Sequence, residues 1–379
     1  MRILVATGIF HPESGGPATY LYQLLPALRA RGHDLTVLTF SDAAGPPADH
    51  YPYEVVRIPR RSYLFRQATY FHMASRLWHG HDLAFVHSLN IPLPAHIRPR
   101  VGKIVGDPAW ERAVNRGWVP PTADVDAFQS AHHGLLVELN KVQRAQAARR
   151  LDGVIVPSEY LRRMVVGWGV DPARVAVIYN ALPEHPAPLA LTRDEARAQL
   201  DLPPAPLLLT VARLTAWKGI DYTLNALQRL DGIHFVVAGD GPMRPAYEAM
   251  AQRLGLAQRV KFLGAFPREK MPLLYRAADY TLLYSGYEGF SHVLLESLHA
   301  GTPVIASDKG GNPEVVQHGV NGLLVPYPDV AALTDALTQA FATGQRARLA
   351  TNTHCGLERF RWERMVEQTA QFLEAFGGG

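Results

Sequence analysis

The chain has 379 residues, of which 47% are hydrophobic, so it can bury the cores of about two domains. Its net charge is +4, and its single cysteine, Cys355, excludes an intramolecular disulfide and a cysteine-rich metal site. No run approaches the ~20 apolar residues of a spanning helix and no signal-peptide pattern opens the chain, so we expect a cytoplasmic protein. Zinc-finger spacing, basic heptads and ribonucleoprotein-type aromatic motifs are lacking, which argues against nucleic acid as a partner.

The first half of the chain alternates apolar, β-rich runs with helical patterns. Residues 2–7 and 34–40 are typical of strands, and the amphipathic stretch 17–32 between them predicts a helix. This order is that of a βαβ unit, whose two strands are parallel. Further strands are predicted at residues 83–88, 102–107 and 153–158.

The alternation restarts after a proline-rich stretch, residues 180–192, which is typical of an interdomain linker. Strands separated by helical patterns are predicted at residues 207–213, 234–241, 260–264, 280–285 and 303–307. We therefore predict an α/β protein with two doubly wound, Rossmann-like domains facing each other across a cleft. The predicted parts are an N-terminal domain (1–185), a C-terminal domain (186–355) and a final helix (356–379) that packs back on the N-terminal domain.

The loop after the first strand contains Gly8, Gly15 and Gly16. This spacing is not G-x-G-x-x-G, so a dinucleotide cofactor is not supported. A glycine pair directly before a helix lets an anion or a sugar approach the backbone at the helix start. A plain turn is an equally good interpretation of the pair.

Two cations follow the first strand of the second series. Arg213 stands at the predicted strand end and Lys218 lies five residues on, before a helix. Together with the N–H groups of that helix, they are placed to neutralise a diphosphate. The alternative is a pair of solvated surface cations.

The stretch "YEGFSHVLLE" places carboxylates at both ends of a predicted helix start. The backbone N–H groups of Gly289, Phe290 and Ser291 can bind phosphate oxygens, and Glu288 can accept hydrogen bonds from the hydroxyls of a polyol. Glu296 lies inside the helix, where an unpaired buried carboxylate is costly and two vicinal ribose hydroxyls would satisfy it. An exposed helix glutamate is the alternative.

These motifs together carry a resemblance to a family. A glycine pair after the first strand, "RLTAWKG", "AGDGP", "YEGFSHVLLESLHAGTPVIASDKGGNPEVV" and "NGLLVP" stand in the order found in retaining glycosyltransferases of family four. The resemblance spans nearly the whole chain and is strongest over residues 207–326. Glu288 and Glu296 match the E-x7-E signature of that family, whose fold is GT-B.

The resemblance implies that the second domain holds a nucleotide-diphosphate sugar and the first a hydroxyl acceptor. Arg213 and Lys218 match the family's diphosphate-binding pair. Glu296 matches its ribose-binding glutamate, and Glu288 matches its donor-sugar glutamate.

Three further positions are matched in the same way. Gly16 matches the glycine that approaches the donor phosphate from the first domain, and Phe266 and Pro267 match the loop that holds the base. Relatives of this type need no metal or other cofactor. The chain shows no paired-aspartate motif at a strand end, so two cations and a helix N-terminus are expected to stabilise the leaving diphosphate.

One position departs from the family pattern. Many relatives carry a histidine at the end of the strand that here reads "KIVGDPAWE", and this chain offers Gly106 or Asp107 there. Asp107 could accept the proton of the acceptor hydroxyl or support positive charge at the anomeric carbon. The equal alternative is that Asp107 caps the following helix.

The reaction implied is retaining transfer of a hexose or similar sugar from a UDP or GDP donor to a glycan, lipid-linked or small-molecule hydroxyl, as in polysaccharide biosynthesis. A sugar-nucleotide epimerase of the same fold and a non-catalytic sugar-nucleotide-binding subunit are the alternatives. Residues 60–80 interleave arginines with aromatic residues, which suits peripheral docking to an anionic membrane at its inner face. A partly buried helix that packs its aromatics explains the same pattern.

Overall fold

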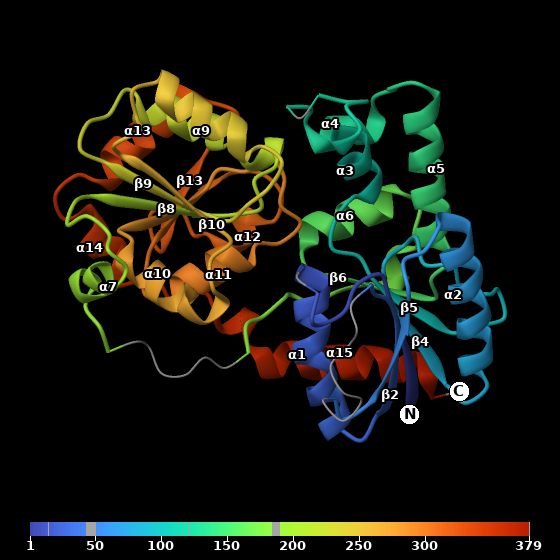
Figure 1. Ribbon diagram of the computed structural model, residues 1–379. Coiled ribbons are helices and arrows are strands. Elements are labelled where there is room, and N and C mark those ends of the chain that lie inside the picture. Colours follow the sequence, from blue (N-terminus) through green and yellow to red (C-terminus); the bar gives the residue numbers. More distant parts are fainter. Residues whose placement is uncertain (14, 43–50, 121, 184–189, 379) are drawn as a thin grey trace. The chain divides into compact units, whose positions relative to one another are not determined.

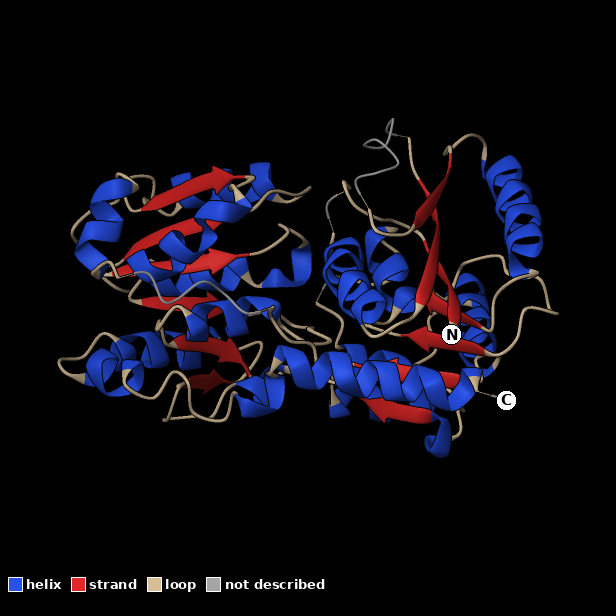
Figure 2. Ribbon diagram, turned by 90° about the horizontal axis from the view of Figure 1, so that it is seen from below, coloured by secondary structure: helices blue, strands red, loops and turns tan. Residues whose placement is uncertain are grey.

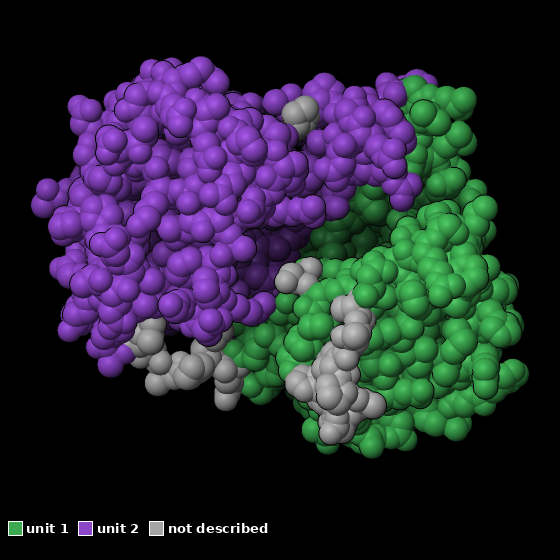
Figure 3. All heavy atoms as spheres, viewed as in Figure 1, with its two compact units in different colours: residues 1–109, 134–183, 362–379 green, residues 110–133, 184–361 purple. Residues whose placement is uncertain are grey.

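The computed structural model describes residues 1–13, 15–42, 51–120, 122–183 and 190–378 (Figure 1). The chain forms two compact units (Figure 3). Unit 1 contains residues 1–109, 134–183 and 362–379, and unit 2 contains residues 110–133 and 184–361. Among the described residues, every helix is too short or too polar to span a bilayer.

Unit 1 is built on a seven-stranded parallel sheet in the order β3-β2-β1-β4-β5-β6-β7. The strands are β1 (Arg2–Thr7), β2 (Asp34–Phe40), β3 (Glu54–Ile58), β4 (Leu83–His87), β5 (Arg100–Lys103), β6 (Gly153–Val156) and β7 (Val175–Val177). The predicted strands 2–7 and 34–40 are confirmed. The strand predicted at 102–107 lies earlier in the chain, because the backbone leaves the sheet after Ile104 and Pro108 opens a helix.

Two helices far apart in sequence cover one face of this sheet. Helix α1 (Gly16–Ala30) presents five buried apolar side chains to the strands, and α15 (Trp362–Gly377) adds Met365, Val366 and Leu373 to the same core. In Figure 2, α15 is the long helix that ends beside the C-terminus. Right-handed crossovers place the helices between later strands on the opposite face. The remaining helices that begin in the unit-1 part of the chain are α2 (Tyr63–Trp78), α3 (Pro108–Asn115), α5 (Leu135–Arg149) and α6 (Glu159–Gly167).

Unit 2 is built on a six-stranded parallel sheet in the order β10-β9-β8-β11-β12-β13. Its strands are β8 (Leu207–Val211), β9 (His234–Ala238), β10 (Val260–Gly264), β11 (Tyr280–Leu283), β12 (Val304–Ser307) and β13 (Gly322–Val325). Its helices are α4 (Val125–Ser130), α7 (Arg193–Gln199), α8 (Ile220–Leu227), α9 (Arg244–Arg253), α10 (Met271–Ala277), α11 (His292–His299), α12 (Asn312–Val315), α13 (Val330–Ala340) and α14 (Gln345–Ala350). The predicted α/β class is thus confirmed.

Both sheets change direction of strand order near their centres. In unit 1 the order runs outward in both directions from the pair β1 and β4, and in unit 2 from the pair β8 and β11. Loops that leave such a pair at its carboxyl ends diverge to opposite faces and leave a crevice, which is where open α/β sheets bind ligands. The fold alone therefore directs attention to the loops after β1, β8 and β11.

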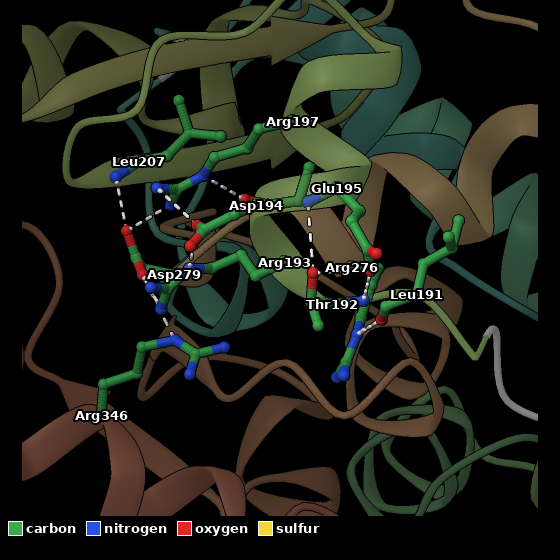
Figure 4. A network of polar contacts seen from close by, with 11 residues as sticks. Leu191, Thr192, Arg193, Asp194, Glu195, Arg197, Leu207, Arg276, Asp279 and Arg346 are labelled. Carbon is green, nitrogen blue, oxygen red and sulfur yellow. Dashed lines mark hydrogen bonds and ion pairs between the residues drawn. The ribbon is translucent and has the colours of Figure 1, made fainter.

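A cluster of arginines at the amino ends of the unit 2 strands has a structural role (Figure 4). The carboxylate of Asp279, directly before β11, accepts hydrogen bonds from Arg193 and Arg197 at 2.7 Å and from the backbone N–H of Leu207 at 2.7 Å. Arg346 lies 3.3 Å from the same carboxylate. These contacts join α7 and α14 to the amino ends of the central strands, far from the ligand-binding edge.

Candidate active site

The loops after β8 and β11 meet at the switch point of unit 2. Gly219, after β8, has φ 67°, and a Cβ there would lie 1.8 Å from the carbonyl oxygen of Tyr284. The backbone N–H of Gly286 donates to the carbonyl of Trp217 at 2.8 Å. Only glycine permits this approach, so the two loops form one continuous surface.

On this surface the Nζ of Lys218 lies 2.5 Å from Oε1 of Glu288. Both side chains are largely shielded from solvent, with exposed fractions of 16% and 13%. Arg213 lies two residues beyond the end of β8 with its side chain exposed. The structure thus brings Lys218 and Glu288 together, with a second cation from the same loop.

A glycine pair, Gly310 and Gly311, packs directly against the backbone of the loop after β11. A Cβ at Gly310 would lie 2.1 Å from the carbonyl oxygen of Glu288, and one at Gly311 would lie 2.6 Å from that of Gly289. The N–H of Gly311 donates to the Glu288 carbonyl at 2.8 Å. The glycines of "DKGG" are therefore required by the close packing of the loop after β12 under the loop after β11.

Helix α11 begins where this loop ends. Ser291 is its N-cap, and its hydroxyl accepts a hydrogen bond from the N–H of Leu294 at 3.3 Å. Phe290 is buried beside Phe360, with ring centroids 5.5 Å apart. The backbone N–H groups at this helix start point toward the loop, and together with the positive end of the helix dipole they make the loop suited to an anion.

Glu296 lies in the second turn of α11 and accepts a hydrogen bond from the Tyr275 hydroxyl at 2.6 Å. Burial raises the pKa of Glu296, while this hydrogen bond and the charge of Arg268 oppose the rise. Burial and the nearby carboxylate raise the pKa of Tyr275 as well. Glu296 is therefore not a solvated helix glutamate, and one carboxylate oxygen is already fixed by a tyrosine.

Phe266 and Pro267 lie in the loop between β10 and α10. Phe266 is partly buried and packs against the cluster formed by α10 and the sheet, whereas Pro267 is exposed. The next residue, Arg268, acts electrostatically on Glu296 and on Tyr275. No local sequence pattern indicates Arg268 or Tyr275, since each lies more than twenty positions before Glu296.

The glycines of "AGDGP", after β9, have a packing explanation. A Cβ at Gly239 would lie 1.9 Å from the carbonyl oxygen of Ala212, and one at Gly241 would lie 2.5 Å from that of Leu214. The N–H of Leu214 donates to the Asp240 carbonyl at 2.9 Å. These contacts hold the loop that carries Arg213 against its neighbour.

In unit 1, Gly16 is the first residue of α1, at the switch point after β1. Its N-cap, Gly15, has φ 156°, and a Cβ on Gly15 would lie 2.7 Å from Ile9. By contrast, no described atom lies within 4 Å of a Cβ built on Gly16. The space over Gly16 is thus open, at a helix start that can accept an anion.

Asp107 is fully buried between β5 and α3. Its Oδ1 accepts from the N–H of Ala109 at 2.9 Å, and its Oδ2 accepts from Arg144 of α5 at 2.5 Å. The Arg144 guanidinium also lies over the ring of Trp168, 4.3 Å from its centroid. Both carboxylate oxygens therefore have protein partners in unit 1.

A buried polar cluster lies beside the carboxyl ends of β4 and β5. The Nζ of Lys103 donates to Oδ1 of Asn180 at 2.7 Å and lies 3.7 Å from the centre of the Tyr20 ring. Burial holds the pKa of Lys103 well below its ordinary value, and burial and Lys103 do the same for His87. No sequence signal marked this cluster, because its members come from four separate segments.

Across the described residues, no group of three or more histidine, cysteine, aspartate or glutamate side chains could hold a metal ion. The ligand-binding edge of unit 2 instead offers cations, a helix N-terminus and two carboxylates. Such a set can bind a diphosphate and, through its carboxylates, hydroxyl groups.

Family models identify the class of protein that this fold and site define. Residues 14–184 match the model of Glycosyltransferase Family 4, and residues 192–354 match that of glycosyl transferases group 1. The chain therefore carries the two domains of a GT-B glycosyltransferase.

Particular relatives agree with this class. A GDP-mannose-dependent alpha-(1-6)-phosphatidylinositol monomannoside mannosyltransferase of Mycobacterium tuberculosis is 28% identical over 396 aligned residues, which cover 98% of each chain. A D-inositol 3-phosphate glycosyltransferase of Xylanimonas cellulosilytica is 36% identical over 194 residues, 49% of this chain and 46% of that one.

Solved structures show the same fold. Sucrose-phosphate synthase of Thermosynechococcus elongatus has a TM-score of 0.80 at 23% identity and covers 99% of this chain and 98% of its own. Anabaena Alr3699/HepE in complex with UDP-glucose has a TM-score of 0.77 at 23% identity and covers 99% and 100%. The predicted GT-B fold is thereby confirmed.

Proposed function

We propose that this glycosyltransferase is retaining and moves a hexose or similar sugar from a UDP or GDP donor to a hydroxyl acceptor. The observation that carries the proposal is the Lys218–Glu288 pair at the switch point of unit 2, next to the N-terminus of α11. The GDP-mannose and UDP-glucose of the relatives' names support the choice of donor class.

Each group at this edge has a proposed role in holding the donor. Arg213, Lys218 and the backbone N–H groups of Phe290 and Ser291, directly before α11, bind the diphosphate. The Tyr275 hydroxyl donates to Oε2 of Glu296, and the other carboxylate oxygen, Oε1, accepts hydrogen bonds from the ribose hydroxyls.

The remaining donor contacts complete the site. Phe266 and Pro267 hold the base, and Glu288 accepts hydrogen bonds from the hydroxyls of the transferred sugar. For Gly16 of unit 1, the proposed role is to bind the donor phosphate, which its open helix start could accept.

The proposed reaction is an attack of the acceptor hydroxyl on the face of the anomeric carbon from which the diphosphate departs. The bond between that carbon and the phosphate oxygen breaks, and the bond to the acceptor oxygen forms. The acceptor proton passes to the leaving phosphate oxygen. The carboxylate of Asp107 is proposed to support the positive charge that develops at the anomeric carbon. The cations offset the charge that develops on the diphosphate, so no metal or other cofactor is needed. Activity should persist in EDTA, and a loss that Mg²⁺ restores would contradict this point.

The acceptor is proposed to be a hydroxyl of a glycan, a lipid-linked saccharide or a small molecule. The phosphatidylinositol and inositol phosphate in the relatives' names make membrane-linked polyols the first acceptors to test. A thermal-shift screen of UDP, GDP and ADP tests the donor class, since a ligand at 100 times its Kd stabilises by ~2.7 kcal/mol. If none of the three nucleotides shifts the melting temperature, the proposal is overturned.

We further propose that unit 1 contacts the inner face of an anionic membrane. The first turns of α2 expose Tyr63, Leu64 and Phe65, with 79% of Leu64 accessible. Residues 55–81 contain five arginines and no aspartate or glutamate. A basic segment with exposed apolar side chains suits an anionic lipid surface.

Helix α5 adds a second exposed apolar surface. It buries Lys141 and Arg144, whereas its first two turns expose apolar side chains. The exposed apolar residues are Leu135, Leu136, Leu139 and Val142. Since α2 and α5 cover the same face of the unit 1 sheet, both can meet one lipid surface.

A further inference from the structure

The indole of Trp110 packs against both donor loops. It is only 1% exposed, and its ring centroid lies 5.3 Å from that of Trp217 and 5.1 Å from that of Tyr287. The interplanar angles of 70° and 64° make both contacts edge-to-face, the favoured geometry for aromatic pairs.

The two partners of Trp110 are the residues directly before the donor-binding pair. Trp217 precedes Lys218, and Tyr287 precedes Glu288. One side chain from elsewhere in the chain thus contacts the backbone neighbours of both members of the ion pair. A shift of the indole therefore changes the distance between the two loops.

A second contact joins the same segment to the glycine loop. Asp124 caps α4 by accepting from the N–H groups of Asp126 and Ala127, and its other oxygen accepts from Lys309 at 2.9 Å. Lys309 directly precedes Gly310, on which the backbone of Glu288 rests. Segment 110–133 therefore contacts all three loops around Glu288 within unit 2.

We propose that segment 110–133 holds the donor loops in register and that Trp110 is a positioning residue that places Glu288 relative to Lys218. This inference rests on the proposed donor site. Trp110 need not touch the substrate, because its effect passes through Trp217 and Tyr287. Trp110, Trp217 and Gly286 also line a small pocket beside the Glu288 loop, and truncation of the indole would enlarge it.

Calorimetric titration of Trp110→Leu, Trp110→Phe and wild type tests the proposal, with a nucleotide sugar and the matching nucleoside diphosphate as ligands. Misplacement of Glu288 should affect the transferred sugar more than the diphosphate. We expect Trp110→Leu to weaken the nucleotide sugar about tenfold and the diphosphate less than about threefold, with a matching fall in kcat. Trp110→Phe keeps an aromatic edge and should restore most of both.

Phe235→Leu is the matched control, because Phe235 is a fully buried aromatic residue in the core of the same unit. It should leave the ratio of the two affinities unchanged. Equal weakening of both ligands by Trp110→Leu, or no change in either, would overturn the proposal. If Trp110→Leu does not fold, Asp124→Asn keeps the α4 cap and removes the charge opposite Lys309, and an unchanged affinity ratio in that variant also overturns it. Wild-type protein that binds no nucleotide would instead refute the donor site itself.

Discussion

The ammonium of Lys218 and the carboxylate of Glu288 form an ion pair at 2.5 Å, although they are 70 residues apart in sequence. Without a ligand, the two charges neutralise each other at a position largely shielded from solvent. A bound diphosphate competes for the lysine and frees the carboxylate to accept sugar hydroxyls. The pair thus links diphosphate binding to recognition of the sugar.

Removal of either cation should weaken diphosphate binding selectively. We expect Arg213→Ala and Lys218→Ala each to cost ~1.5–3 kcal/mol for the nucleoside diphosphate, because each removes a charge-assisted contact. The uncharged nucleoside serves as the control ligand in the same calorimetric titration. Equal losses for nucleoside and nucleotide would show that these residues do not bind the diphosphate.

Neutralisation of Glu288 should separate binding from transfer. Glu288→Gln releases Lys218, so we expect the affinity for a nucleoside diphosphate to stay constant or rise, while kcat falls about 100-fold or more. Glu269→Gln, an exposed acid of the same unit, is the matched control. A Glu288→Gln enzyme with wild-type kcat would exclude a role for this carboxylate in the reaction.

Sequence alone predicted the residues of this pair but not their contact. Strand-end position and helix N-termini identified Arg213, Lys218, Glu288 and Ser291, because parallel sheets bring such ends to one edge. Tyr275 lies 21 residues before its partner Glu296, and no local pattern marks a bond over that separation. Trp110 contacts the donor loops from a segment that lies between two strands of unit 1 in the chain, and no sequence pattern indicates that this segment belongs to unit 2.

The raised pKa of Glu296 gives a pH-dependent prediction. The folded-state pKa lies above the ordinary 4.5, so Glu296 binds a proton more tightly in the folded protein than in the unfolded chain. That stabilisation is fully present below pH 4.5 and is lost as the pH rises through the raised pKa. Glu296→Gln, which mimics the protonated form, should match wild-type Tm at low pH, exceed it near pH 7, and weaken donor binding. A Tm well below wild type at pH 7 would indicate a structural role instead.

Asp107 allows a catalytic role to be distinguished from a structural one. Asp107→Asn weakens a buried ion pair, and Arg144→Gln breaks the same pair while it keeps the carboxylate. We expect both variants to lower Tm, because each leaves a buried group with a poorer partner. If Asp107 acts in the transition state, only Asp107→Asn should also lower kcat by about 100-fold or more. Equal kcat values for the two variants would leave Asp107 as a structural residue.

Membrane contact should depend on lipid charge and on the exposed apolar side chains. We expect co-sedimentation with phosphatidylglycerol vesicles, little with phosphatidylcholine vesicles, and a decline with added salt. Leu64→Glu and Leu139→Glu should each reduce binding, whereas Val105→Glu, at an exposed apolar residue outside both helices, should not. Binding that ignores lipid charge and salt would rule out the proposed surface.

NMR of a complete reaction distinguishes retaining transfer from inversion and from epimerisation. Wild-type protein is incubated with GDP-mannose or UDP-glucose and a phosphatidylinositol acceptor, and the ¹H and ³¹P spectra are followed over time. We predict that nucleoside diphosphate appears together with a sugar attached to the acceptor in the anomeric configuration that it had in the donor. An inverted product, an epimerised sugar still attached to its nucleotide, or a bound donor that stays intact would each refute retaining transfer by this protein.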